Sequence, residues 1–482
     1  MNLSCSGRTG TGPHKQTMKA ILVLSGLGII ALLAELFRFR RVLFPLVLLG
    51  LLGAVAAALS YFWFDEGKEW NDTYVKGMLV FDTFSILSSS VIIITGLLWL
   101  MMSQSYFKEE SSKTDHYALF LFSMAGAVTL TCYNNMTMLF LGIEMLSIPL
   151  YVMAGSKKDS LASNEAALKY FLLGAFSTGF LLFGITLIYG ATKSFDLPTI
   201  STYVTDHAGE IPGLFHAGIV MLLVGLLFKI SAAPFHFWAP DVYQGSPTSV
   251  TAFMSTVVKT AAVAGFARLF AYPGFMADAA FWGPILAVCV VLTIMVGNVF
   301  AAVQNNVKRL LAYSSISHAG FLLLAILSNA PGSVIYYTAA YSLASLAAFA
   351  VLGIIMQHSG DDAMERFNGL GKRSPLLAFT LTLALLSMAG IPPTAGFFGK
   401  YYVFMQAFAS GHAWLVLAGI IGSLIGVYYY FRIIIAMYFK DVPAGAEGSP
   451  AANDLQQLVL FITSLGILVL GIMPDLLLNL FK

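Results

Sequence analysis

Four ionisable residues lie deep inside apolar stretches of this chain, and their types limit the chemistry they can do. Glu144 is nine residues into an apolar run, Lys259 twelve residues into a second and Lys229 fifteen residues into a third. Lys400 lies well inside a fourth. Because a charge at the centre of a bilayer is costly, such residues commonly mark an ion or proton path. These four residues therefore predict a path for protons.

Lysine is the informative residue type in this set. Arginine stays protonated, whereas a buried lysine changes its pKa readily. Desolvation lowers the pKa of a lysine and a nearby carboxylate raises it. A lysine that alternately gains and loses a glutamate partner can therefore bind and release a proton. The alternative is a static ion pair that locks two helices, but three such lysines with one glutamate favour the proton path.

Composition excludes most other classes of protein. The chain has 482 residues, of which 58% are hydrophobic and 10% are charged, whereas soluble domains are about 45–50% apolar and about 25% charged. The net charge of +2 gives no reason to expect a nucleic-acid partner. Cys5, Cys132 and Cys289 lie far apart, which argues against an iron–sulfur cluster, a structural zinc or a disulfide framework. We therefore expect no cofactor on this chain.

The apolar stretches are long enough to cross a bilayer. A spanning helix needs about 20 mostly apolar residues, and we predict an all-α polytopic membrane protein with about fourteen such helices. The predicted spans are 18–37, 42–64, 79–102, 116–133, 135–154, 166–190, 214–236, 247–270, 281–303, 309–328, 332–357, 375–406, 411–438 and 454–480.

The ends and the orientation follow from polar residues. Residues 1–17 are polar and read as a flexible extension before a transmembrane domain at 18–482, with a signal peptide as the alternative. The loops after the odd-numbered spans 1, 3, 5, 9, 11 and 13 carry most of the Lys and Arg residues. Basic loops stay in the cytoplasm, which predicts that both termini lie on the opposite, outer side of the membrane.

Two predicted spans contain helix breakers near their lysines. Pro234 follows Lys229 by five residues, and Pro392 and Pro393 precede Lys400. Proline removes a backbone donor, and broken helices at corresponding positions of two halves point to an ion site in a repeat architecture.

The two broken spans are the seventh and the twelfth, which suits two five-helix inverted repeats. Spans 4–8, at about 116–270, would form the first repeat, and spans 9–13, at about 281–438, the second. A C-terminal helix at about 454–480 would follow. The alternative is that these prolines only kink the helices for packing.

Several motifs resemble a known family. LGIEMLSIPLY, FKISAAPFHFWAPDVYQGSPTSVTAFMSTVVKTA, VKRLLAYSSISHAGF and MAGIPPTAGFFGKYYVF are similar to the antiporter-like membrane subunits of respiratory complex I, above all to the subunit N family of bacterial NADH:quinone oxidoreductase. The resemblance covers essentially residues 18–482, and APDVYQGSPTSVTAF is its most specific part.

The resemblance implies a role for each buried charge. Glu144 corresponds to a fifth-helix glutamate that modulates the seventh-helix Lys229. Lys259 corresponds to an eighth-helix connecting residue, and Lys400 to the twelfth-helix lysine near the exit half-channel. Electron transfer in partner subunits would drive proton translocation here. Those partners would be membrane subunits M, L, K, J, A and H and the NADH-oxidising arm, with flavin, iron–sulfur clusters and quinone in partner subunits.

Other residues allow two interpretations each. Lys169 either joins the polar axis near Glu144 or snorkels to the surface. His318 is a proton relay or a hydrogen-bonded packing residue, and His236 is a relay or, as we favour, a helix-end cap. Arg268 reads as a snorkelling anchor.

Two further features read as interfacial. Asp82 lies near a span end, with an ion pair to another helix as the alternative. The run Tyr428-Tyr429-Tyr430-Phe431 reads as an interfacial belt or as packing.

Rival functions are a cation/proton antiporter of the Mrp type and a membrane subunit of a related hydrogenase complex. A structural anchor without an ion path is the third alternative. The buried charges alone barely distinguish the antiporter and the hydrogenase subunit from a complex I subunit, because all three need a lysine–glutamate path.

Overall fold

The structure is a computed structural model that describes residues 18–34, 37, 40–64, 72–74, 77–104, 114–442 and 448–481. The predicted extension at 1–17 lies outside the described residues. Within these ranges the mainly helical membrane fold is confirmed, since nine helices are long and apolar enough to cross a bilayer. The strands in the described part form one antiparallel hairpin, β1 Asp72–Tyr74 with β2 Leu79–Phe81.

The long helices follow one another with short connections. In chain order they are α1 Met18–Ala34, α2 Arg40–Phe64, α3 Thr83–Met102, α5 Thr114–Cys132, α6 Met136–Ala154, α7 Leu161–Thr192, α9 Gly213–Lys229, α12 Lys259–Phe270, α14 Ala279–Ala302, α15 Val307–Leu327, α16 Pro331–Ser359, α18 Pro375–Ala389, α19 Ala395–Ala409, α20 Ala413–Phe439 and α21 Asp454–Ile472. The shorter ones are α8 Leu197–Asp206, α10 Trp238–Gly245, α11 Thr248–Phe253, the π-helical turn η1 Met254–Val258, α13 Pro273–Ala277, η2 Met364–Phe367, α17 Leu370–Arg373, α22 Asp475–Leu478 and η3 Asn479–Phe481.

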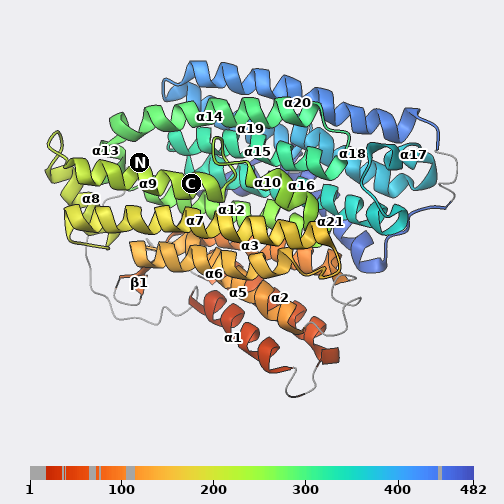
Figure 1. Cartoon of the computed structure of the whole chain (residues 1–482), viewed down its shortest axis with the longest axis horizontal. Helices are drawn as coiled ribbons and strands as arrows, with labels where there is room; N and C mark the ends of the chain where they lie inside the picture. The colour runs from red at the N-terminus through yellow and green to blue at the C-terminus, as the bar shows by residue number, and fades with distance from the viewer. Residues whose placement is uncertain are drawn as a thin grey trace.

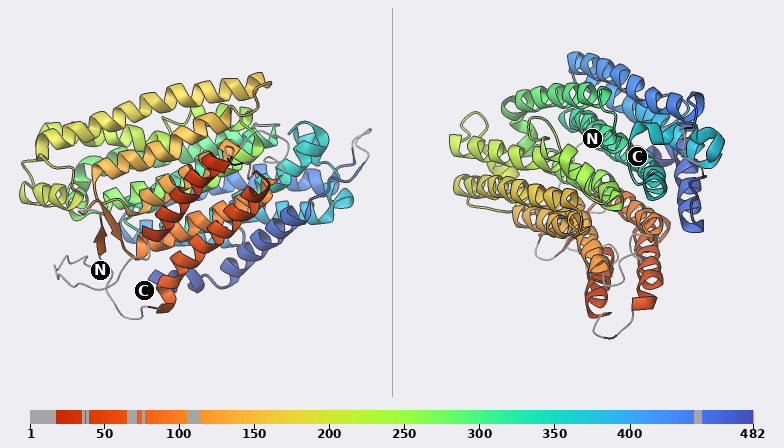
Figure 2. Two further views of the ribbon diagram at one scale, coloured as in Figure 1. Left: turned by 90° about the horizontal axis from the view of Figure 1, so that it is seen from below. Right: turned by 45° about the vertical axis from the view of Figure 1, so that its right-hand side comes forward.

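The helices lie side by side along the long axis of the molecule (Figure 1). Helices α5, α6, α7 and α9 form one side of the bundle, and α14, α15 and α20 form the other, with α12 and α16 between them. The α1–α2 pair projects from the body and packs on α5 and α3 (Figure 2). The segments that hold the buried lysines therefore meet in the middle of the bundle.

The first interruption falls between α9 and α10, where the sequence predicts a broken helix. α9 ends at Lys229 because Ser231 adopts a left-handed conformation with φ 62°. The Ala232 N–H then donates to the Leu227 carbonyl at 2.9 Å, which is the six-to-one bond of a Schellman cap. Pro234 follows this cap, so the proline prevents continuation of the helix rather than ending it.

The second interruption has the same form. α18 ends at Ala389, Gly390 has φ 84°, and the Ile391 N–H donates to the Leu386 carbonyl at 3.0 Å. Glycine has no Cβ and adopts this conformation without strain. The predicted span 375–406 is therefore two helices, α18 and α19.

Two boundaries differ from the sequence-based expectation. The start of the predicted span 79–102 is strand β2, and α3 begins after Asp82, whose side chain accepts from the Ser85 N–H at 2.8 Å. The predicted loop 191–213 contains α8, which is capped by Asp196 and buries Ile200 and Val204. α8 is amphipathic, and it is much shorter than the about 20 residues that a membrane-spanning helix needs.

Candidate functional site

Lys229 is held by two hydroxyl groups of α6. Its ammonium donates to Ser147 Oγ at 2.9 Å and to the Tyr151 hydroxyl at 3.3 Å. Ser147 and Tyr151 are four residues apart and therefore share one helix face. Lys229 is only 8% exposed and is the last residue of α9. The dipole of a helix favours a cation at its C-terminus.

Glu144 lies on α6 three residues before Ser147, which is about 4.5 Å along the helix axis. Its Oε1 atom is buried and has no hydrogen-bond partner among the described residues. The ion pairs found in the described ranges do not include one between Glu144 and Lys229. The structure therefore places Glu144 one turn from the Ser147 hydroxyl that binds Lys229, while the lysine ammonium itself is held by hydroxyl partners.

A small cavity reaches Lys229 from between α5, α6, α9 and α12. Its volume is about 10 Å³ and its other walls include Leu130, Ile143, Leu226 and Val258. A space of this size holds about one water.

Lys259 follows a π-helical turn and is 2% exposed. Such turns are rare and occur frequently at functional sites. The Lys259 ammonium donates to both the carbonyl and the hydroxyl of Ser315 on α15. The Tyr341 hydroxyl donates to the same Ser315 Oγ at 2.9 Å. Ser315 thus joins α12, α15 and α16.

A buried tyrosine extends this network toward the first break. Tyr243 of α10 is fully buried, and its phenol group lies near the side chains of Ser315 and Ser231. Ser231 lies two residues beyond Lys229. Tyr243 therefore places a buried hydroxyl group between the end of α9 and the Ser315 contact of Lys259.

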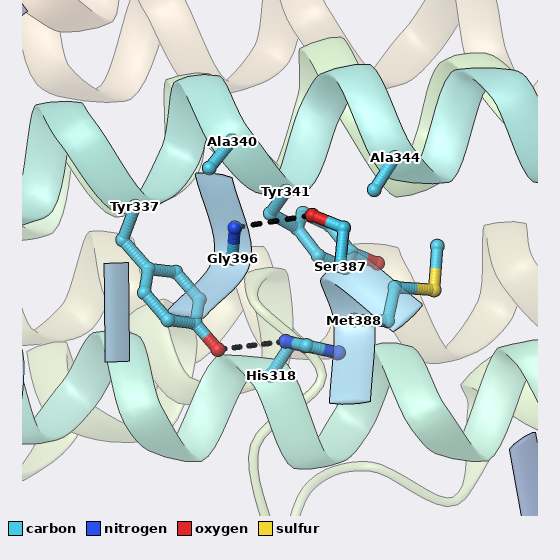
Figure 3. A pocket seen from close by; sticks show the side chains of 8 residues that line it. All are labelled: His318, Tyr337, Ala340, Tyr341, Ala344, Ser387, Met388 and Gly396. Carbon is cyan, nitrogen blue, oxygen red and sulfur yellow. Dashed lines mark hydrogen bonds between the residues drawn. The ribbon is translucent and has the colours of Figure 1, made fainter. Parts of the chain in front are cut away.

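His318 continues the polar run on α15, three residues after Ser315. Its Nδ1 atom lies 2.7 Å from the Tyr337 hydroxyl, and its Nε2 atom lies 3.2 Å from the Tyr430 hydroxyl. Figure 3 shows Tyr337 reaching from α16 toward the imidazole. The ring centroids of His318 and Tyr341 are 4.7 Å apart.

Lys400 occupies the second break. Its ammonium donates at 2.9 Å to the carbonyl of Ala389, the last residue of α18, and lies 4.9 Å from the centre of the Phe321 ring. A cavity of about 10 Å³ separates this break from His318, with Ser387 and Gly396 in its wall (Figure 3). Lys400 is 7% exposed, so the bundle buries Lys229, Lys259 and Lys400 together with His318.

The two weaker candidates lie apart from these contacts. Lys169 is 39% exposed and makes ion pairs with Glu165 at 2.7 Å and with Asp241 at 2.8 Å. Arg309 binds the other oxygen of Asp241 at 2.9 Å. His236 lies in the first break, where its Nδ1 atom is buried without a hydrogen-bond partner among the described residues.

Sequence reasoning missed that Lys308 is buried, because its position predicts an exposed lysine in a cytoplasmic loop. It is 2% exposed and donates to the carbonyls of Gln244 and Ser246 at the end of α10. Nothing in its sequence context distinguishes it from the exposed basic residues, because the partners are backbone atoms 62 or more residues away.

One further interpretation was wrong. Arg268 does not snorkel, because its side chain is 5% exposed and pairs with Asp82 at 2.5 Å. This contact confirms the alternative of an ion pair for Asp82. For the aromatic run, the packing alternative is confirmed at Tyr429 and Tyr430, which are buried and whose hydroxyls bind Asn298 and His318.

Within the described ranges, no group of three or more His, Cys, Asp and Glu residues could hold a metal ion. The site chemistry is thus that of protonatable amines, an imidazole, a carboxylate and hydroxyl groups.

These features define an antiporter-like membrane protein with two broken helices and buried lysines, and comparison with known proteins gives the family. The family model described as "NADH:quinone oxidoreductase/Mrp antiporter, TM" matches residues 133–426. The chain belongs to this family. The matched range includes Glu144, Lys229, Lys259 and Lys400.

Curated relatives narrow the family further. NADH-quinone oxidoreductase subunit N of Cytophaga hutchinsonii is 43% identical, and the alignment covers 96% of this chain and 99% of that protein. Subunit N of Flavobacterium psychrophilum is 42% identical over 96% of this chain and 100% of its own length. The resemblance to the subunit N family is therefore confirmed.

Solved structures share the fold. A chain of respiratory complex I from Thermus thermophilus superposes with a TM-score of 0.81 at 33% identity, covering 95% of this chain and 98% of that one. A chain of the archaeal membrane-bound sulfane sulfur reductase has a TM-score of 0.85 at 24% identity, and one of the Mrp complex of Dietzia sp. has 0.84 at 20%. Each of these two covers 96% of both chains and shows the fold alone.

Proposed function

We propose that this chain is the N subunit of a bacterial NADH:quinone oxidoreductase, and that it translocates protons without any redox step of its own. The path would run through Glu144, Lys229, Lys259 and Lys400. The observation that carries the proposal is the buried network of amines, hydroxyls and His318 that crosses the bundle between the two broken helices. Ionisable groups are costly in a bilayer, and those that are present commonly mark ion or proton paths.

The gap between Glu144 and Lys229 is the natural control point of this path. When the carboxylate approaches, it favours the protonated lysine, and when it withdraws, the desolvated lysine releases its proton. Moving one charge against 100 mV costs about 2.3 kcal/mol. Because one pKa unit corresponds to about 1.36 kcal/mol, a change of about two units is sufficient. Electron transfer in partner subunits would supply the energy.

The finer architecture belongs to the same proposal. Fourteen spans would form inverted repeats at about 116–270 and 281–438, followed by a helix at about 454–480. Support comes from the equivalent Schellman caps at Ser231 and Gly390, each next to a proline break. The transmembrane domain would cover 18–482 after a flexible extension at 1–17.

The assembly and the secondary sites are also proposed. The chain would lie in the inner membrane with both termini in the periplasm, beside subunits M, L, K, J, A and H. Flavin, iron–sulfur clusters and quinone would belong to partners. His318 would be a relay, supported by its contacts on both ring nitrogens. Lys169 and His236 would be auxiliary relays toward the surface, where Lys169 meets Asp241.

The first experiment purifies the tagged chain in mild detergent from its own membranes. Co-purification of NADH:quinone activity, flavin and iron supports the proposal. Recovery without flavin or iron, but with sodium- or potassium-driven proton exchange in vesicles, would favour an antiporter instead.

The second experiment tests the path in the assembled complex. Glu144→Gln should lower the rate of NADH-driven proton uptake by inverted vesicles, because a neutral amide cannot favour the charged lysine. Glu210→Gln is the matched control, since Glu210 is exposed in a loop. Normal uptake by an assembled Glu144→Gln complex would remove the carboxylate from the path.

A further inference from the structure

Tyr430 of α20 makes a contact that the lysine path does not use. Its hydroxyl lies 3.2 Å from His318 Nε2 and also contacts the Ser314 hydroxyl. The Tyr430 side chain is buried, and the Tyr429 ring lies tilted beside it with 4.5 Å between the ring centroids. Tyr337 binds the opposite nitrogen, Nδ1, at 2.7 Å. The imidazole is therefore held at both ends by phenol groups from two different helices.

A tyrosine hydroxyl carries one proton and can both donate and accept. In one arrangement, His318 Nε2–H donates to Tyr430, and Tyr430 donates to Ser314. In the other, Ser314 donates to Tyr430, and Tyr430 donates to the unprotonated Nε2. Each tautomer of His318 therefore has a hydrogen-bond partner on this side, because the two hydroxyl groups can turn to match whichever form is present.

This matters because a relay must receive a proton on one nitrogen and release another from the opposite nitrogen. After one such transfer the imidazole is neutral again but has changed tautomer, and it must return before the next transfer. If the hydrogen-bond partner of one ring nitrogen is removed, the tautomer that carries its proton there has a buried, unpaired N–H group, which is costly. The neighbouring charges that face His318 are Lys259 on α12 and Lys400 on α19.

We propose that Tyr430 is a positioning residue that, through the Tyr430–Ser314 hydroxyl pair, keeps both tautomers of His318 accessible and so lets His318 pass protons between Lys259 and Lys400. The placement supports this role. His318 lies one turn from Ser315, which holds Lys259, and it lines the cavity that faces the Lys400 break (Figure 3). The inference rests on the proposed proton path and adds α20 to it.

The test uses the whole complex in inverted membrane vesicles. Tyr430→Phe keeps the ring and removes the hydroxyl. We expect the proton uptake rate per assembled complex to fall about three- to tenfold, the effect of losing one hydrogen bond of ordinary strength. Ser314→Ala keeps Tyr430 and removes only its second partner, and should lower the rate about two- to fivefold. Tyr336→Phe is the matched control, because the buried Tyr336 hydroxyl donates to the Leu470 carbonyl instead.

A double variant separates positioning from general packing. If Tyr430 acts through His318, His318→Asn combined with Tyr430→Phe should pump no more slowly than His318→Asn alone, since coupled residues are not additive. Additive losses would overturn the proposal. So would wild-type uptake by assembled Tyr430→Phe and Ser314→Ala complexes.

The failure of this inference differs from failure of the proposed function. Impaired Lys229→Ala with unimpaired Tyr430→Phe and Ser314→Ala would reject only the role of Tyr430. Unimpaired Lys229→Ala would reject the path itself.

Discussion

Gly396 controls how closely the two halves of the second broken helix approach each other. A Cβ atom added at Gly396 would lie 1.8 Å from the carbonyl oxygen of Ser387 in the last turn of α18. Non-bonded heavy atoms are most stable at about 3.5 Å or more, so α18 and α19 would have to separate by roughly 1.7 Å. Backbone atoms cannot rotate away as a flexible side chain can. Gly396→Ala therefore has to displace the helix start that positions Lys400 one turn later.

The displacement should affect transport more than folding. Overpacking of this kind costs typically about 1–3 kcal/mol, which a large bundle tolerates. A misplacement of about 1 Å in a catalytic arrangement costs about a hundredfold in rate. We expect assembled Gly396→Ala to lose at least about tenfold in NADH-driven proton uptake, because the Lys400 contact with Ala389 depends on this approach.

The assay measures proton uptake by inverted vesicles, normalised to the recovered complex. Gly179→Ala in α7 is the control, since nothing lies within 4 Å of its added Cβ, and it should pump like the wild type. Wild-type uptake by assembled Gly396→Ala would refute the claim that the break positions Lys400.

Two predictions concern stability. Asp82→Ala removes both a helix cap, worth about 1 kcal/mol, and the carboxylate partner of the buried Arg268. Because Asp82 is 32% exposed, we expect a total loss of about 2–4 kcal/mol, below the sum for a fully buried pair. Asp82→Asn should lose less stability, since it keeps a capping side chain. Thermal unfolding in detergent measures the melting temperature of both variants. An Asp82→Ala variant that melts at the same temperature as the wild type would contradict the ion pair with Arg268. The Arg366 guanidinium holds the pKa of Asp361, in the loop after α16, below its ordinary value. The ionised Asp361 therefore stabilises the folded state at pH values above the unfolded pKa of about 3.9. This stabilisation is lost as the pH falls through the folded pKa. Asp361→Asn should therefore melt slightly lower than wild type at pH 7 and equally at acid pH, and a difference that persists at low pH would rule out the charge effect.

The sequence predicts the membrane-embedded character well because it depends on local composition. Long apolar runs identify spanning helices, and Lys229 and Lys400 stand out because charges are rare in them. The two breaks are also predictable, since proline cannot continue a helix.

The remaining features depend on contacts between distant segments. Ser231 ends α9 in a left-handed conformation that serine uncommonly adopts, so no local signal predicts it. Lys308 and Tyr430 look like a loop charge and an interfacial aromatic until the fold places them against α10 and His318. The partner of Lys308 is 62 residues away and that of Tyr430 is 112 residues away. Contacts between such distant residues produce no periodic pattern in the sequence.

The central claim is that protons pass through Lys229. The most direct measurement is the number of protons taken up per NADH oxidised by inverted vesicles that contain assembled Lys229→Ala complex. Lys193→Ala, which changes an exposed loop lysine, is the control. The account predicts a lower ratio for Lys229→Ala and an unchanged ratio for Lys193→Ala. A wild-type ratio in Lys229→Ala would contradict the proposed path.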